Sequence, residues 1–176
     1  GFVHVEREDG RPSSNGQGRV GLAWSKDYGN NFAYLGHIVV PYGDPQNTNV
    51  AGVPYVVRDG WLYVYYYEKC YLKGQPNGGR YTGAAVARAR LSEVINSARL
   101  GRNVPWHKYY EGGKGGLWSE SGIGGKCTMV IDPSNGIIHG DAVYSKVTDK
   151  FYIFTHHSLA GARLHSSHDK SFVRLF

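Results

Sequence analysis

The chain has 176 residues, of which 14% are aromatic and 19% charged, a balance that excludes a disordered tail or a coiled coil and predicts one folded domain. Its 25 glycines follow no triplet period, which excludes collagen and predicts short strands joined by many tight turns. The formal net charge of +6 comes from Lys and Arg scattered along the chain, so nucleic acid is disfavoured as a partner. The sequence contains no run of about 20 apolar residues, so no membrane helix is predicted.

The first predicted strands run over residues 20–25 and 32–40. The segment between them, Ser25 to Phe32, reads S-x-D-x-G-x-x-aromatic, the Asp-box pattern found between the outer strands of a propeller blade. We expect the Ser25 hydroxyl and the Asp27 carboxylate to satisfy amides of the turn, and the Phe32 ring to pin the turn onto the sheet. A degenerate copy without the glycine spans residues 167–172.

The strongest predicted element is a β-hairpin of residues 53–57 and 61–67. Asp-Gly within the connecting segment 58–60 favours it, because both residues of such a turn must accept positive φ. Just beyond it lies Cys70, which with Cys127 forms either one disulfide or two buried thiols. We favour the thiols.

Strands are also predicted over 83–90 and 106–111. Between them, apolar residues at helical spacing from Leu91 to Ala98 predict one short surface helix, with Ser92 as its cap and Gly101 at its end.

A second hairpin is predicted from residues 141–147 and 151–156. Its pattern of β-branched and aromatic residues around a short turn is similar to that of the first hairpin, which indicates an internal repeat. Two further strands, 162–166 and 172–176, are expected after it. No cofactor or metal is expected, because neither the cysteines nor His156–His157 have metal-site spacing and no Gly-rich loop has a phosphate-binding pattern.

The two Asp-box copies lie two blade steps of about 71 residues apart. The chain is therefore expected to hold about two and a half blades. Residues 1–52 would supply the outer strands of one blade, 53–127 a second blade with a helical insertion, and 128–176 a third. Propellers usually close with 4 to 8 blades, so open edges should pair with a second copy, a homodimer.

From about Val20 onward, six short segments resemble in order and spacing the five-bladed β-propeller glycoside hydrolases, the superfamily of arabinanases and β-xylosidases. The segments are G-L-A-W-S-K-D from Gly21, V-P-Y from Val53, A-V-A-R-A from Ala85, K-Y-Y-E-G from Lys108, G-I-G-G from Gly122 and H-G-D from His139. The resemblance implies an all-β, five-bladed type of propeller built of four-stranded antiparallel sheets. It also implies a secreted or periplasmic protein that acts on or binds a polysaccharide or oligosaccharide. The net charge of +6 makes an acidic polysaccharide at least as natural a partner as nucleic acid.

In that superfamily three carboxylates project into a central pocket. Carried over, they make Glu120 the general acid, Asp141 the base or the acid-tuning partner, and Asp44 the third carboxylate. Each has a structural alternative: Glu120 as a solvated loop acid, Asp141 as a turn cap and Asp44 as a turn residue.

The predicted substrate-binding residues are His139, Tyr55, Trp118, Tyr144 and Arg58. Tyr65 and Trp61 could also stack on sugar rings, although an aromatic strand face commonly belongs to the core. The family's usual base lies on the innermost strand of the first blade, and residues 1–19 show no such strand with an inward Asp. The alternative function is therefore a non-catalytic carbohydrate-binding or structural propeller fragment that assembles with a second copy.

Overall fold

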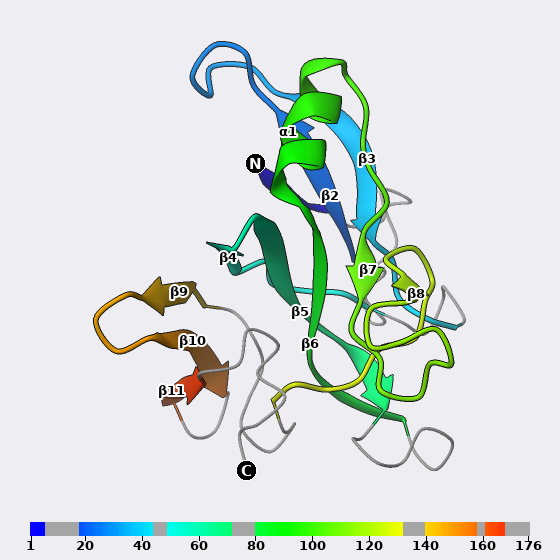
Figure 1. Ribbon diagram of the computed structural model, residues 1–176, viewed down its shortest axis with the longest axis vertical. Coiled ribbons are helices and arrows are strands. Elements are labelled where there is room, and N and C mark those ends of the chain that lie inside the picture. The colour runs from blue at the N-terminus through cyan, green and yellow to red at the C-terminus, as the bar shows by residue number, and fades with distance from the viewer. Residues whose placement is uncertain (6–17, 44–48, 72–79, 132–139, 158–160, 168–176) are drawn as a thin grey trace.

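The computed structural model describes residues 1–5, 18–43, 49–71, 80–131, 140–157 and 161–167 (Figure 1). Strands dominate this part of the chain, which confirms the predicted all-β class. The elements are β1 (Phe2–Val5), β2 (Arg19–Trp24), β3 (Ala33–Val39), β4 (Tyr55–Arg58), β5 (Trp61–Tyr71), β6 (Arg80–Arg90), α1 (Leu91–Arg99), β7 (His107–Lys108), β8 (Glu120–Ser121), β9 (Ala142–Ser145), β10 (Lys150–His157) and β11 (Gly161–Ser167). None of the described helical residues forms a segment that could cross a membrane.

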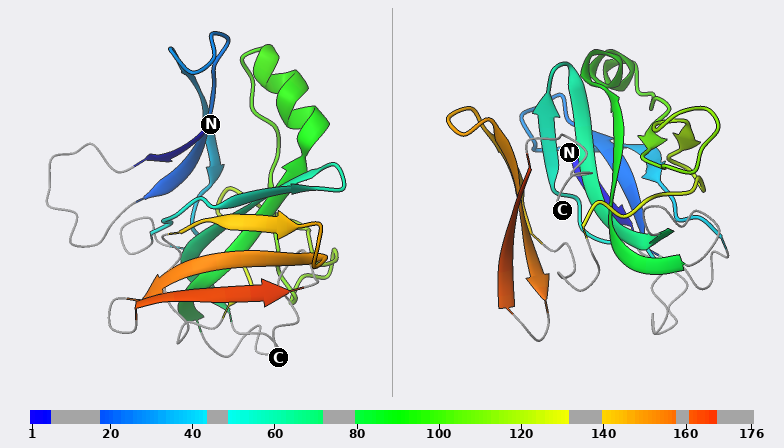
Figure 2. Two further views of the ribbon diagram at one scale, coloured as in Figure 1. Left: turned by 90° about the vertical axis from the view of Figure 1, so that its left-hand side faces the viewer. Right: turned by 60° about the horizontal axis from the view of Figure 1, so that its bottom comes forward.

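The strands form three antiparallel sheets with the orders β1-β2-β3, β4-β5-β6-β7-β8 and β11-β10-β9. One core cluster packs between the first and the middle sheet. A second packs between the middle and the third sheet, and Figure 2 shows these two sheets side by side. The central strands β5 and β6 of the middle sheet are thus buried on both faces. Four-stranded sheets were predicted, whereas the described residues form sheets of three, five and three strands.

Strand β5 shows why both faces of the middle sheet are apolar. Side chains alternate between the two faces of a strand, so Leu62 and Val64 enter the first cluster while Tyr63 and Tyr65 enter the second. The full burial of Tyr65 confirms the core alternative for this residue. Strand β6 pairs with β5 along all 11 of its residues and alternates in the same way.

Both predicted hairpins are confirmed. In the first, β4 and β5 pair from Arg58 opposite Trp61, and the turn residues Asp59 and Gly60 have φ of 48° and 75°. Positive φ at both positions matches a two-residue turn whose twist suits a hairpin. In the second, β9 pairs with β10, and Asp149 in the turn has φ of 50°.

Helix α1 was predicted correctly except at its start. It begins at Leu91 with Arg90 as N-cap and no side-chain cap, because β6 runs directly into it and the Leu91 N–H donates to Gly60 O. The prediction that Ser92 caps the helix is therefore wrong. At the other end Gly101 has φ of 72° and closes the helix, as expected.

Cys70 and Cys127 form a disulfide, which corrects our preference for two thiols. Tyr71 lies beside the segment after β8: its N–H donates to Cys127 O, and its carbonyl accepts the Met129 N–H. These bonds bring the two cysteine Cα atoms to 5.0 Å, within the range a disulfide requires.

Other strand predictions differ from the structure at their boundaries. Strand β1 was not expected, β8 was not expected, and the strand predicted over 106–111 is reduced to the two residues of β7. The predicted strand 172–176 and most of the second Asp-box copy lie outside the described residues.

The turn between β2 and β3 has the expected hydrogen bonds. Ser25 Oγ donates to Asp27 Oδ1 (2.8 Å) and accepts the Gly29 N–H (2.7 Å). The Asp27 carboxylate accepts the Asn31 backbone N–H (2.9 Å) and a side-chain N–H from the same residue (2.6 Å). Phe32 does not pin the turn as predicted, because its side chain is 59% exposed.

These bonds, those from Asn31 foremost, lower the pKa of Asp27 to about 2. The carboxylate therefore stabilises the fold fully above a pH of about 4, the unfolded pKa, and this contribution is lost as the pH falls to about 2. We expect Asp27→Asn to lower the Tm at about pH 6, and the difference from wild type to shrink by about pH 2.5. Thermal unfolding of both proteins across this range measures it, and a difference that stays constant would contradict the expectation.

Candidate functional site

The structure places the predicted catalytic carboxylates on different sheets. Glu120 begins β8, is half-buried, and accepts the Lys126 N–H at its Oε2 (2.9 Å). Asp141 precedes β9, is exposed, and accepts the Ala142 N–H at its Oδ1 (2.8 Å), which is the turn-capping contact given as its alternative. Asp44 lies outside the described residues.

Glu120 and Asp141 are not brought together. Strand β8 is at the opposite edge of the middle sheet from β4, and β9 lies beside β4 (Figure 1). Four strand spacings separate β8 from β4, roughly 19 Å. Carboxyl pairs of glycoside hydrolases lie within about 9.5 Å of each other. The placement of Glu120 and Asp141 does not support their action as a catalytic pair, which stays a prediction.

Three of the predicted substrate-binding residues, in contrast, lie on the same side of the middle sheet, around the second core cluster. We call this group, with two further residues, the arginine–aromatic cluster: Arg58, Trp61, Arg88, Trp118 and Tyr144. The Arg58 guanidinium lies 4.2 Å from the centre of the Tyr144 ring, and that of Arg88 lies 4.0 Å from the Trp61 ring and 4.1 Å from the Trp118 ring.

The register of the strands explains the cluster. Arg58 is paired with Trp61 across the first hairpin. Strand β6 brings Arg88 to the same face of the sheet, two residues before Arg90, which also lies over the Trp61 ring (3.9 Å). Trp61, Trp118 and Tyr144 all pack against the second core cluster. The cluster is therefore built at the junction of the middle and third sheets.

Comparison with protein-family models, curated proteins and solved structures finds no match.

Fixed charges orient the cluster. Arg58 lies 3.4 Å from the Asp59 carboxylate and 3.9 Å from that of Asp149. The Tyr144 hydroxyl donates to Asp149, and this hydrogen bond is the main cause of a raised Tyr144 pKa. Burial lowers the pKa of Arg88, which a hydrogen bond with the Tyr63 side chain partly offsets. Two turns from separate sheets are thereby joined through Arg58 and Asp149.

The chemistry of the cluster suits polar ligands with flat apolar faces. Guanidinium groups donate several hydrogen bonds in one plane, and indole and phenol rings offer stacking surface. The Asp59 and Asp149 side chains, 46% and 76% exposed, add acceptors at the rim. Among the described residues, no three metal-ligating side chains gather.

Tyr55 lies on the other face of the middle sheet from the cluster. Its side chain is 51% exposed, and its ring packs 5.2 Å from that of Phe2. It lines an apolar pocket of about 260 Å³ among β1, β2, β4 and α1. His139 lies outside the described residues.

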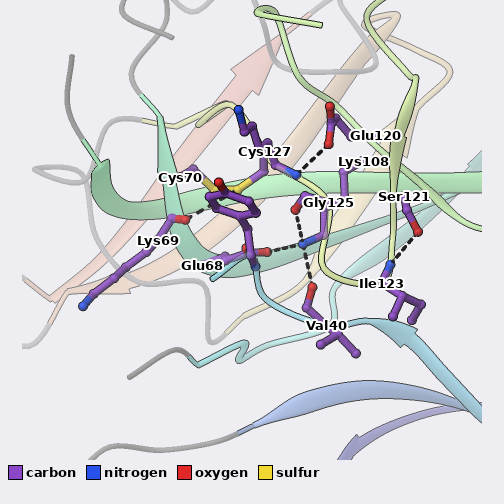
Figure 3. A network of polar contacts seen from close by, with 12 residues as sticks. Val40, Glu68, Lys69, Cys70, Lys108, Glu120, Ser121, Ile123, Gly125 and Cys127 are labelled. Atoms are coloured by element: carbon purple, nitrogen blue, oxygen red, sulfur yellow. Dashed lines mark hydrogen bonds and ion pairs between the residues drawn. A yellow bond between two sulfur atoms is a disulfide. The ribbon is translucent and has the colours of Figure 1, made fainter. Parts of the chain in front are cut away.

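A buried ion pair that sequence reasoning missed joins β5 to β7 (Figure 3). Lys108 Nζ lies 2.7 Å from Glu68 Oε2, and both side chains are completely buried. Lys108 Nζ also donates to Val40 O (2.8 Å) and Gly125 O (3.0 Å), and Glu68 Oε1 accepts the Tyr42 N–H (2.7 Å). The pair thus ties the segments after β3 and β8 to the middle sheet.

Proposed function

We propose that the protein binds a polysaccharide through the arginine–aromatic cluster, on a β-propeller-like stack of sheets. The observation that carries the proposal is two guanidinium–ring contacts on one face of the middle sheet, Arg58 on Tyr144 and Arg88 on Trp118, at partly exposed residues from separate segments of the chain. Aromatic rings with guanidinium donors and carboxylate acceptors are what sugar recognition needs: stacking for the ring and hydrogen bonds for the hydroxyls.

The arrangement of the three sheets supports the proposal that the fold is propeller-like. Blades of a propeller pack face to face with their first strands towards a common axis. Here each sheet packs on the next, β4 lies beside β9, and the Phe2 ring of β1 contacts Tyr55 of β4. The first strands of the three sheets are thus neighbours.

We propose that the protein is located outside the cytoplasm, in the periplasm or the extracellular space. Disulfides persist in oxidising environments such as the periplasm and the extracellular space, and are rare in the cytosol. The Cys70–Cys127 bond supports this location.

The proposed homodimer would cover an apolar face of the third sheet. Val143, Phe154 and Leu164 are about half exposed and lie on the face opposite the second core cluster. A second copy packed there would cover these side chains, and light scattering tests whether the protein is a dimer.

Binding is tested with two cluster variants. We expect Arg58→Ala and Tyr144→Ala each to weaken binding of arabinan or xylan about tenfold, or about 1.4 kcal/mol, because each removes a ring or a donor from the cluster. Affinity electrophoresis on a panel of neutral polysaccharides measures this.

The control is Arg102→Ala, which removes an exposed arginine after α1 and should bind as wild type does. Wild type that binds no polysaccharide, or cluster variants that bind unchanged, would refute the proposal. Release of reducing ends, abolished both in Glu120→Gln and in Asp141→Asn, would instead support the glycoside hydrolase with Glu120 as acid and Asp141 as base or tuning partner.

A further inference from the structure

A lysine enclosed by three tyrosine rings lies at the far end of β5. Lys126 Nζ is 5.7 Å from the centre of the Tyr42 ring, 5.9 Å from that of Tyr71 and 5.8 Å from that of Tyr110. The rings also contact one another, with centres 6.1 Å apart for Tyr42 and Tyr71 and 5.9 Å apart for Tyr71 and Tyr110. We call these four residues the tyrosine cage.

Each member of the cage is tied to a neighbouring segment of the chain, and the Tyr110 N–H donates to Leu117 O. The disulfide joins the residue before Tyr71 to the residue after Lys126. Glu68 binds the backbone of Tyr42, and the Glu120 carboxylate accepts the Lys126 N–H.

The buried ion pair acts on the same place. Lys108 holds the carbonyl of Gly125, the residue before Lys126, while its partner Glu68 holds Tyr42 (Figure 3). A buried ion pair is often no more stabilising than apolar residues of similar volume. This one, together with the disulfide, fixes the backbone on both sides of Lys126, a residue of intermediate exposure.

Within the described part of the chain, the N–H groups of the Lys126 ammonium have no hydrogen-bond acceptor. Among the described residues, no carboxylate pairs with Lys126 Nζ and no oxygen accepts a hydrogen bond from it. The surrounding rings reduce its contact with water, which strengthens its attraction to an anion. An ammonium can donate three hydrogen bonds, so it suits a group with several anionic oxygens.

We propose that the tyrosine cage is a subsite for the anionic group of an acidic saccharide, a carboxylate or a sulfate ester. Lys126 binds the charge, and the partly exposed rings of Tyr42 and Tyr71 pack against the apolar face of the sugar, while the buried Tyr110 ring supports that of Tyr71. The choice of a saccharide rests on the proposed function. The tyrosine cage restricts the proposed ligand to polysaccharides that carry negative charge.

The cage is a separate place from the arginine–aromatic cluster. Trp61 begins β5 and Tyr71 ends it, and a strand of 11 residues spans roughly 33 Å. Substitutions in the two places should therefore act independently.

The test uses the full chain with Lys126→Gln, and Lys114→Gln as the matched control, since Lys114 is an exposed lysine in the loop before Trp118. Calorimetric titration with oligogalacturonate, with a sulfated oligosaccharide and with a neutral oligosaccharide of equal length gives the affinities. We expect Lys126→Gln to weaken binding of an anionic ligand at least tenfold and Lys114→Gln to change it less than twofold. The two anionic ligands distinguish carboxylate from sulfate.

A measurement on the unaltered protein guards against misfolding of the variant. Reductive methylation followed by mass spectrometry should show that the anionic ligand protects Lys126 and leaves Lys114 reactive. The inference is overturned if wild type binds neither anionic ligand, or if Lys126→Gln binds them unchanged, or if Lys126 is not protected.

The outcomes separate this inference from the proposed function. If neutral polysaccharide binding depends on Arg58 and Tyr144 while anionic ligands bind no better than neutral ones, the cage inference fails and the proposed function stands. If anionic ligands depend on Lys126 and no polysaccharide depends on the cluster, the proposed function fails and the cage stands as a site for short acidic saccharides.

Discussion

Replacing Lys108 with methionine is expected to lower the free energy of unfolding by about 3–5 kcal/mol. The substitution keeps most of the side-chain volume but leaves the completely buried Glu68 carboxylate without its counter-charge. It also removes the donor to two backbone carbonyls, those of Val40 and Gly125. Urea unfolding followed by tryptophan fluorescence measures the change.

Two further variants show whether the stranded charge is the cause. Lys114→Met alters an exposed lysine and should stay within about 0.5 kcal/mol of wild type. Adding Glu68→Gln to Lys108→Met removes the charge but keeps an acceptor for the Tyr42 N–H. The double variant should therefore be more stable than Lys108→Met alone by about 1–3 kcal/mol. A loss below about 1 kcal/mol in Lys108→Met would show that the pair is not the constraint inferred from its burial.

Removing the disulfide is expected to cost about 4 kcal/mol. The bond closes a loop over a sequence separation of 57 residues, and the chain-entropy relation gives a stabilisation of about this size for such a loop. Cys70→Ala combined with Cys127→Ala should shift the urea midpoint downward. Wild type unfolded in the presence of dithiothreitol should shift in the same way.

The reductant also provides the control for this prediction. Dithiothreitol should leave the midpoint of the double alanine variant unchanged, since that variant has no bond to reduce. Equal midpoints for wild type with and without dithiothreitol would mean that the bond does not form in solution.

The elements predicted well were those with local signals. Asp59-Gly60 accepts positive φ wherever it occurs, and the apolar spacing from Leu91 to Ala98 repeats with the helical period. Strand β1 has no such signal, because its pairing partner β2 lies beyond residues 6–17 and only long-range pairing defines it. The disulfide depended likewise on a distant alignment of Tyr71 with Cys127 and Met129.

The candidate sites show the same division. Arg58, Trp118 and Tyr144 were singled out by residue type and by family resemblance, but the contacts of Arg58 with Tyr144 and of Arg88 with Trp118 depend on how the strands align and the sheets pack, which the sequence does not report. Lys126 gave no signal at all, because a single lysine in a Gly-rich stretch reads as solvated surface. Its three tyrosines come from segments far apart in the chain.

The double-sided burial of the middle sheet governs how the chain unfolds. Strands β5 and β6 supply side chains to both core clusters, so separating them exposes both at once. Neither outer sheet keeps a complete core once the middle one is lost. We therefore expect the three sheets to unfold as one cooperative unit, in which a destabilising change in either core cluster also destabilises the other.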